Sequence, residues 1–247
     1  MPTDGNSRVL HPDCPQPVRR AVMKQKWLDL AYLHWRCDPA AVARLLPDGL
    51  DVDTFDGEAW VGLVPFSMRG IGVPGLPAVP WLGSFPEINV RTYVIRNGVP
   101  GVWFHSLDVN RFLPALVARA TYRLPYCWGG ASNRLEGSTL SSSARRRWPG
   151  SGPSTELRVR VGDVITEQSP LEVFLTARWG LYSRGVGGRL MYAPVDHPRW
   201  VLHRAVAEHV DDSLIAAAGL PAPTGEPHCM FSPGVPVRIG MPRRVTW

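Results

Sequence analysis

Cysteines, charged side chains and long apolar runs are all scarce in this sequence of 247 residues. The four cysteines are scattered and form no C-x-x-C pair, which excludes a disulfide-dense scaffold and the usual zinc motifs. Charged residues make up 19%, below the usual level of about 25%, so coiled coils are not expected. No apolar stretch has the length of a membrane span or a signal peptide. We therefore expect a cytoplasmic protein with no membrane partner.

Glycine and proline are abundant instead, with 24 and 25 residues spread along the chain. This composition predicts many turns and short strands rather than a helical bundle. Ten tryptophans exclude a disordered protein. We predict an α+β fold, mainly antiparallel β, with a curled sheet and short peripheral helices. Polar, proline-rich residues 1–21 are expected to form a flexible N-terminal arm, and residues 22–247 a single domain.

The net charge is +6, and 25 of the 27 basic residues are arginines. A nucleic-acid-binding surface would need these arginines in one stripe with interleaved aromatic residues. The one cluster, Arg145–Arg147, lies between Ser- and Gly-rich segments and is interpreted as a solvated hairpin or loop. A nucleic-acid partner is therefore not favoured.

Periodicity and turn signals define the expected elements. Asp38 and Pro39 are predicted to begin a short helix, as N-cap and first residue. Asp56-Gly57 and Asn97-Gly98 predict tight hairpin turns. The apolar, Gly/Pro-rich segment 70–86 is interpreted as a lid or pocket wall. Helices are predicted over 40–46, 111–120, 170–179 and 211–218, and strands over 25–35, 52–55, 59–68, 87–95, 101–109, 157–161, 189–193, 200–210 and 235–239.

The predicted strand 87–95 carries the most informative pattern. Alternate residues of a strand share a face, so Glu87, Asn89, Arg91 and Tyr93 form one polar row. This row is either a face exposed to water or the lining of a cavity inside a closed sheet. In a cavity, the arginine could bind a carboxylate and the glutamate could act as a general acid or base.

The partner strand over 101–109 offers fewer signals. Alternation predicts Phe104, Ser106 and Asp108 on one face and His105 on the other, so Ser106 and His105 do not form a ready dyad. No metal site is expected, because no histidine has a carboxylate in register. No phosphate-loop, dinucleotide or nucleophile-elbow motif is present, and we predict no cofactor.

Seven segments follow one another along the chain in this order: KQKWLDLAYLHW, LLPDGLDVDTFDGEAWVGLVPFSM, FPEINVRTYV, GVWFHSLD, ARATYRLPY, FLTARWGLY and DHPRW. Together they resemble the uncharacterised YqjF-like family of the acetoacetate-decarboxylase-like superfamily. The resemblance implies a curled sheet that closes into a cone or barrel around a central pocket.

The resemblance also shows a departure from the decarboxylases, which use a pocket lysine to form a Schiff base. Their Pro-Lys-Lys run corresponds here to Pro125, Tyr126 and Cys127, and the only lysines are Lys24 and Lys26. An imine-dependent decarboxylase is therefore not expected.

The residues assigned to the site combine the strand pattern with this resemblance. Glu87 and Tyr126 are the candidate catalytic residues. The candidate substrate-binding residues are Asn89, Arg91, Tyr93, Arg119 and Tyr122.

Two functions remain open. The first is lyase- or hydratase-type chemistry on a small oxo or carboxylate compound, without a Schiff-base lysine. The alternative is a non-catalytic protein that binds a small molecule, which the ten tryptophans and the apolar segment 70–86 favour equally well. The superfamily resemblance also suggests a homo-oligomer.

Overall fold

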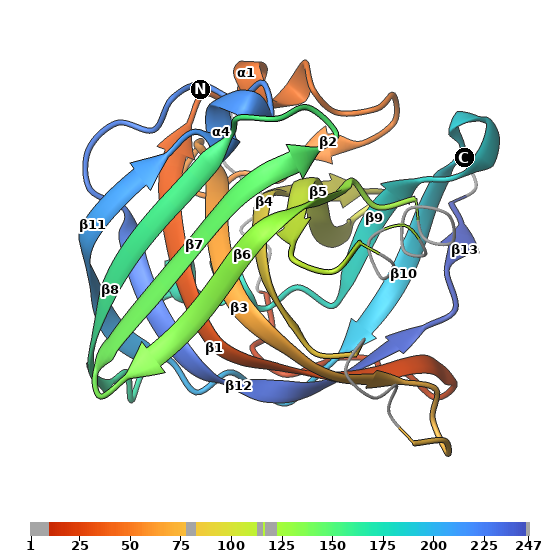
Figure 1. The fold of residues 1–247 in the computed structure, drawn as a ribbon. Coiled ribbons are helices and arrows are strands. Elements are labelled where there is room, and N and C mark those ends of the chain that lie inside the picture. The colour runs from red at the N-terminus through yellow and green to blue at the C-terminus, as the bar shows by residue number, and fades with distance from the viewer. Residues whose placement is uncertain (1–9, 78–82, 113–115, 117–122, 246–247) are drawn as a thin grey trace.

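The structure is a computed structural model that describes residues 10–77, 83–112, 116 and 123–245, and it consists mainly of strands (Figure 1). The strands are β1 (Ala21–Cys37), β2 (Asp51–Val52), β3 (Ala59–Gly72), β4 (Phe85–Arg96), β5 (Val99–Val109), β6 (Tyr126–Glu136), β7 (Thr139–Trp148), β8 (Ser154–Val164), β9 (Gly180–Arg184), β10 (Leu190–Asp196), β11 (His203–Asp212), β12 (His228–Gly240) and β13 (Arg243–Arg244). The helices are α1 (Pro39–Ala43), α3 (Pro170–Thr176), α4 (Leu214–Ala217) and the 3-10 turn η1 (Val186–Gly188).

The sheet closes on itself in two ways. Nine strands form one ring in the order β5-β6-β7-β8-β11-β12-β1-β3-β4, which the antiparallel β4–β5 pair closes. A second ring runs β5-β9-β10-β12-β1-β3-β4 and is closed by the β10–β12 and β5–β9 pairs. Figure 1 shows β6, β7, β8 and β11 on one side of the molecule and β9, β10 and β13 on the other. The predicted curled, closed sheet is confirmed.

Five strands, β12, β1, β3, β4 and β5, belong to both rings, and we call them the shared wall. Its two faces carry different hydrophobic clusters. Ile88 and Val90 of β4 pack with Leu140 and Leu157 inside the nine-strand ring. The opposite face packs with Phe174 of α3 and with β9 and β10, inside the seven-strand ring. Because both faces are buried, these strands are apolar over most of their length.

Local sequence signals explain the boundaries of several elements. The side chain of Asp38 accepts a hydrogen bond from Ala40 N at 3.0 Å, as expected for the N-cap of α1. Ser169 and Glu172 form a capping box at the start of α3. Asn97 and Gly98 both have positive φ in the two-residue β4–β5 turn, which is the geometry that Asn-Gly favours. None of the helices among the described residues is long and apolar enough to cross a membrane.

The predicted hairpin around Asp56-Gly57 is wrong in its strand pairing. A single bridge between Phe55 and Glu58 closes the turn, and β2 pairs with β4 instead of β3. The predicted helices at 40–46, 170–179 and 211–218 are present but shorter. The predicted helix over 111–120 lies mostly outside the described residues, as does part of the predicted lid, 78–82.

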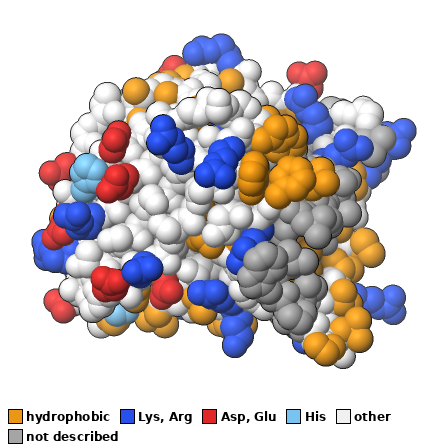
Figure 2. Space-filling model, viewed as in Figure 1, with side chains coloured by type: hydrophobic (Ala, Val, Ile, Leu, Met, Phe, Trp, Pro, Cys, Tyr) orange, Lys and Arg blue, Asp and Glu red, His pale blue; other side chains and the backbone are white. Residues whose placement is uncertain are grey.

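The interpretation of Arg145–Arg147 as a solvated segment is wrong for its middle residue. These residues lie on β7, and Arg146 points into the nine-strand ring, where it forms a buried ion pair with Asp108. Alternation along β7 explains the difference, because Arg145 and Arg147 face outward and are exposed. On the outer face seen in Figure 2, basic and acidic side chains are interspersed rather than gathered into one stripe.

Near the N-terminus, Val18 is buried although it precedes the first strand. Its backbone N–H donates to Asp196 Oδ2 at 3.1 Å, and its carbonyl accepts a hydrogen bond from Arg238 at 2.5 Å. The segment directly before β1 is therefore attached to β10 and β12. The division into an arm and a domain stays a prediction.

Candidate functional site

The polar row of β4 lies on the face of the shared wall that looks into the seven-strand ring. Glu87, Asn89 and Tyr93 are 2%, 3% and 0% exposed, and Arg91 is half-buried. Tyr93 belongs to the hydrophobic cluster inside this ring. The row is therefore not a solvated strand face, and its polar groups must find partners inside the protein or in a ligand.

Glu87 and Tyr126 form the acidic end of this row. Tyr126 begins β6, which runs parallel to β5, and the pairs Asn89–Leu107 and Leu107–Tyr126 bring it next to β4. The Tyr126 hydroxyl donates a hydrogen bond to Glu87 Oε2 at 3.0 Å. This contact places the two predicted catalytic residues within hydrogen-bonding distance of each other.

The electrostatic environment of Glu87 favours its neutral form. Burial removes the carboxylate from water and raises the pKa of Glu87 to about 8, although hydrogen bonds from Tyr126 and Asn89 act in the opposite direction. Burial, together with the nearby carboxylate, also raises the pKa of Tyr126 well above its usual value. A glutamate that titrates near neutral pH is suited to both accept and donate protons.

Tyr93 anchors the other end of the row. Its hydroxyl donates to the carbonyl of Leu175 at 2.8 Å and lies 2.6 Å from Nε2 of His34, so Nε2 carries the proton and donates to Tyr93. Burial, reinforced by the positive charge of Arg91, lowers the pKa of His34 well below its usual value. His34 is therefore neutral at pH 7, with Nδ1 left as an acceptor.

Gly62 makes room for this network. It lies on β3 between His34 of β1 and Arg91 of β4, as the strand register shows. A Cβ atom at Gly62 would lie 2.6 Å from His34 Nε2 and 3.4 Å from Arg91 Cγ. Glycine at this position leaves room for both side chains over the middle strand of the wall.

Arg91 lies between two aromatic rings rather than in an ion pair. Its guanidinium carbon is 5.4 Å from the centre of the Tyr32 ring and 5.7 Å from that of Tyr93. Its Nη2 is 3.5 Å from the Leu175 carbonyl, a long hydrogen bond. Among the described residues no carboxylate forms a salt bridge with Arg91, so its charge is free to pair with an anion.

Several buried polar atoms on this face have no hydrogen-bond partner among the described residues. They include the Tyr32 hydroxyl, His34 Nδ1, Asn89 Oδ1 and Arg91 Nε. Buried polar groups are rarely left unpaired, because each costs about 1–3 kcal/mol. A polar ligand or ordered water would remove this cost.

Aromatic rings flank the site. His197 lies 4.5 Å from the Trp179 ring and 4.8 Å from the Trp200 ring, and Trp27 stacks on Trp200 at 6.3 Å. Burial lowers the pKa of His197 to about 4. His197 is thus neutral at pH 7, whereas Arg178, which is ion-paired with Asp53, lies 4.7 Å from the centre of the Tyr93 ring. No group of three or more metal-ligating side chains is found in the described part of the chain.

Comparison with known proteins shows which family this chain belongs to. The model of the DUF2071 family, described as "Uncharacterized conserved protein", matches residues 24–236. The chain belongs to this family. It is also 31% identical to "Uncharacterized protein YqjF" of Bacillus subtilis (strain 168), over 83% of this chain and 85% of that protein. The predicted relationship to the YqjF-like family is confirmed.

Solved structures of low identity share the fold of this DUF2071 chain. An acetoacetate-decarboxylase-like enzyme from Sphingomonas wittichii RW1 has a TM-score of 0.65 and 16% identity, and the match covers 96% of this chain and 98% of that chain. The enduracididine biosynthesis enzyme MppR complexed with pyruvate has a TM-score of 0.63 and 15% identity, with 91% and 90% covered. The predicted acetoacetate-decarboxylase-like fold is confirmed.

The structure brings together five of the seven predicted site residues. Glu87, Asn89, Arg91 and Tyr93 share one face, and Tyr126 joins them from β6. The other two, Arg119 and Tyr122, lie outside the described residues.

The contributions of β1 and β3 to the site were not predicted from the sequence. The alternation of Leu30, Tyr32 and His34 in an apolar strand was the signal for the first, and the glycine in AWVGLVPF was the signal for the second. Both lysines, Lys24 and Lys26, are exposed on β1.

Proposed function

We propose that the protein binds a small oxo or carboxylate compound on the inner face of the seven-strand ring, where Glu87 transfers protons. The observation that carries this proposal is the buried Glu87–Tyr126 pair on the same strand face as Arg91. Along a strand, Glu87 and Arg91 are about 13 Å apart at their Cα atoms. Both side chains extend from the same face, so a compound of a few heavy atoms could contact both.

Arg91 is the proposed carboxylate-binding residue. Its guanidinium offers a planar fork of donors, and within the described residues its Nε has no partner and no carboxylate neutralises it. Asn89, between Arg91 and Glu87, could orient the substrate. Tyr93, fixed by His34 and Leu175, would hold the position of the Arg91 fork. Arg119 and Tyr122 remain proposed binding residues from the family resemblance.

Glu87 is the proposed proton carrier of a lyase- or hydratase-type reaction. As a carboxylate it would take a proton from the carbon next to the substrate carbonyl, and as an acid it would return one. Its pKa of about 8 keeps both forms accessible near neutral pH, and Tyr126 stabilises the carboxylate. Schiff-base chemistry is not proposed, because both lysines of the chain are exposed. One structural neighbour was solved with pyruvate, a 2-oxo acid, which supports this substrate class.

The alternative proposal is a protein that binds the same compounds without turning them over. The aromatic residues around His197 favour it, because they build an apolar binding surface without adding an acid or base that titrates near pH 7. Both proposals share Arg91 and differ in the role of Glu87.

A single experiment separates these proposals. Pyruvate binding would be measured by calorimetry, and exchange of its methyl protons for deuterium would be followed by NMR in D2O. We expect Arg91→Ala and Arg91→Lys to weaken binding, and Glu87→Gln to keep binding but lose exchange. The matched control is Arg204→Ala, an exposed arginine on β11.

Binding without exchange in the wild type would favour the non-catalytic protein. If pyruvate and acetoacetate both fail to bind, or bind equally well to the Arg91 variants, the oxo-acid proposal is wrong.

A further inference from the structure

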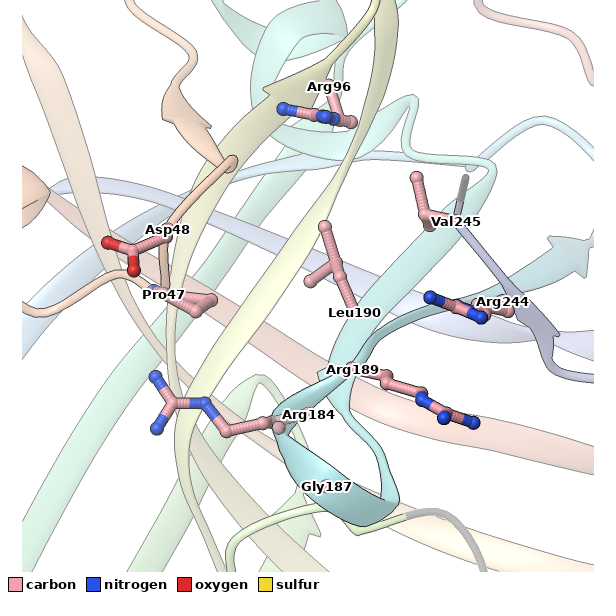
Figure 3. A pocket seen from close by; sticks show the side chains of 10 residues that line it. Pro47, Asp48, Arg96, Arg184, Gly187, Arg189, Leu190, Arg244 and Val245 are labelled. Carbon is pink, nitrogen blue, oxygen red and sulfur yellow. The ribbon is translucent and has the colours of Figure 1, made fainter. Parts of the chain in front are cut away.

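A second concave site lies away from the polar row of β4, at the end of the molecule that contains the β9–β10 turn. It has a volume of about 410 Å³ and lies between the loop after α1, the end of β4, the β9–β10 turn and β13 (Figure 3). Four arginines line it: Arg96, Arg184, Arg189 and Arg244. We call it the arginine pocket. Neither the resemblance nor the comparisons assign a role to it.

The arginine pocket has a large excess of positive charge. Among its described lining residues Asp48 is the single acidic one, so four arginines and one carboxylate line the pocket. Arg184, Arg189 and Arg244 are exposed, and among the described residues none of them forms a salt bridge. Arg96 donates a hydrogen bond to the carbonyl of Gly49 at 2.7 Å, which fixes the direction of its side chain. A ligand with two or three negative charges would balance this excess.

The floor of the pocket is apolar and fixed. Leu190 and Val245 line the pocket and pack on a buried cluster that contains Tyr182 and Tyr192. Figure 3 shows Leu190 in the middle of the group, with the arginines around it. The pocket therefore combines a cationic rim with a small apolar surface, which suits an anionic group attached to a less polar body.

Two glycines expose the backbone at the rim. Gly187 and Gly188 have φ angles of 68° and 76°, and a Cβ atom at either position would meet no heavy atom within 4 Å. The space above them is therefore open, and a ligand can approach the main chain closely there. Glycine-rich turns beside basic side chains are typical of sites that hold phosphate groups.

We infer that the arginine pocket binds a small metabolite through a phosphate or diphosphate group. Arginine forks pair with phosphate oxygens in two-pronged contacts, and a tetrahedral phosphate can accept donors from several sides at once. A single carboxylate would leave most of the positive charge unbalanced. A nucleic-acid strand is less suited, because the arginines surround a hollow of limited size that also contains Asp48. The inference is independent of the proposed function at Glu87.

The test is calorimetric titration of the 247-residue chain with inorganic pyrophosphate at low and at physiological salt. We expect binding that weakens with salt, and a loss of about tenfold in affinity for each of Arg184→Ala and Arg244→Ala, the size of one charge-assisted hydrogen bond. Both residues are exposed, so the variants should fold, and their thermal unfolding verifies this. Arg204→Ala, an exposed arginine on β11, should bind pyrophosphate like the wild type.

Three results would overturn the inference. The first is no binding of pyrophosphate at millimolar concentration. The second is an equal loss of affinity in Arg204→Ala, which would indicate nonspecific attraction to a basic protein. The third is a single-stranded oligonucleotide that binds more tightly than pyrophosphate and depends on the same arginines.

Discussion

Two buried carboxyl groups lie on neighbouring strands of the shared wall and face opposite rings. Asp108 of β5 points into the nine-strand ring, where Arg146 donates to both of its carboxylate oxygens at 2.8 Å and Ser106 adds a third hydrogen bond at 3.1 Å. Glu87 of β4 points into the seven-strand ring, where a neutral phenol, Tyr126, is its partner. One acid is fully paired and the other has no counter-charge among these contacts.

This difference separates a structural charge from a chemically available one. A bidentate ion pair with a third donor satisfies Asp108 and leaves it no free capacity for a substrate. The environment of Glu87 does the reverse, because burial without a cation raises its pKa to about 8. Strongly shifted acids at sites with unpaired polar neighbours are typical of functional sites.

The largest expected effect comes from breaking the structural pair. Arg146→Ala should destabilise the protein by about 3–5 kcal/mol, because it leaves Asp108 buried without a partner. For a chain of this size, the melting temperature should fall by roughly 2–4 °C per kcal/mol. The neighbour Arg145, exposed on the same strand, is the matched control, and Arg145→Ala should change stability by less than about 0.5 kcal/mol. Equal effects of the two changes in thermal unfolding would contradict the assignment.

The next largest effect is the dependence of protein stability on pH that Glu87 causes. Its pKa is raised from 4.5 to about 8 in the folded protein, so its stabilising contribution is complete below pH 4.5 and is lost as the pH rises towards 8. Between pH 6.5 and 8 the contribution of Glu87 to the free energy of unfolding should fall by about 2 kcal/mol. Glu87→Gln should remove this decrease, as measured by urea unfolding across that range.

The buried histidines contribute equally to the wild type and to Glu87→Gln, so the difference between the two proteins isolates Glu87. Burial lowers the pKa of His105 and of His197 from 6.5 to about 4, so their contribution to stability rises with pH until it is complete about one unit above pH 6.5. A wild-type protein whose stability changes with pH in the same way as that of Glu87→Gln would show that Glu87 is charged in the folded state.

The smallest effect concerns the neutral partner of Glu87. Tyr126→Phe should cost about 1 kcal/mol and raise the pKa of Glu87 further, because the lost hydrogen bond stabilises the carboxylate. Tyr192→Phe is the control: its hydroxyl donates to the Trp179 carbonyl at 3.1 Å, away from Glu87. It should lower stability by a similar amount and leave the dependence on pH unchanged. A shift of the pH dependence in both variants would argue against a specific Tyr126–Glu87 contact.

Residues close in sequence could be assigned to the site from alternation alone. The polar row of β4 follows directly from a period of two, and its burial was one of two open interpretations. The same rule failed on β5, where a bulge at His105 separates the pairs Phe104–Arg91 and Ser106–Val90. One extra residue reverses the faces, so Phe104 packs in the seven-strand ring while Asp108 enters the other.

Contacts between segments that are distant in the sequence could not be predicted from local sequence patterns. Asp108 and Arg146 are 38 residues apart, and no local pattern pairs them. The closure of the seven-strand ring by β10 and β12 rests on two residue pairs only. The short helices and tight turns were predictable because caps and Asn-Gly turns act within a few residues.

The shared wall restricts how the length of this chain can change. One residue inserted near the start of β4 would exchange Glu87, Asn89 and Arg91 with Ile88, Val90 and Thr92, because every later side chain moves to the opposite face. The insertion would bring polar groups into one core and remove them from the other, so both rings would lose their packing at once. We expect variation in length to be confined to outer hairpins such as β6–β7, and the shared wall to change by substitution alone.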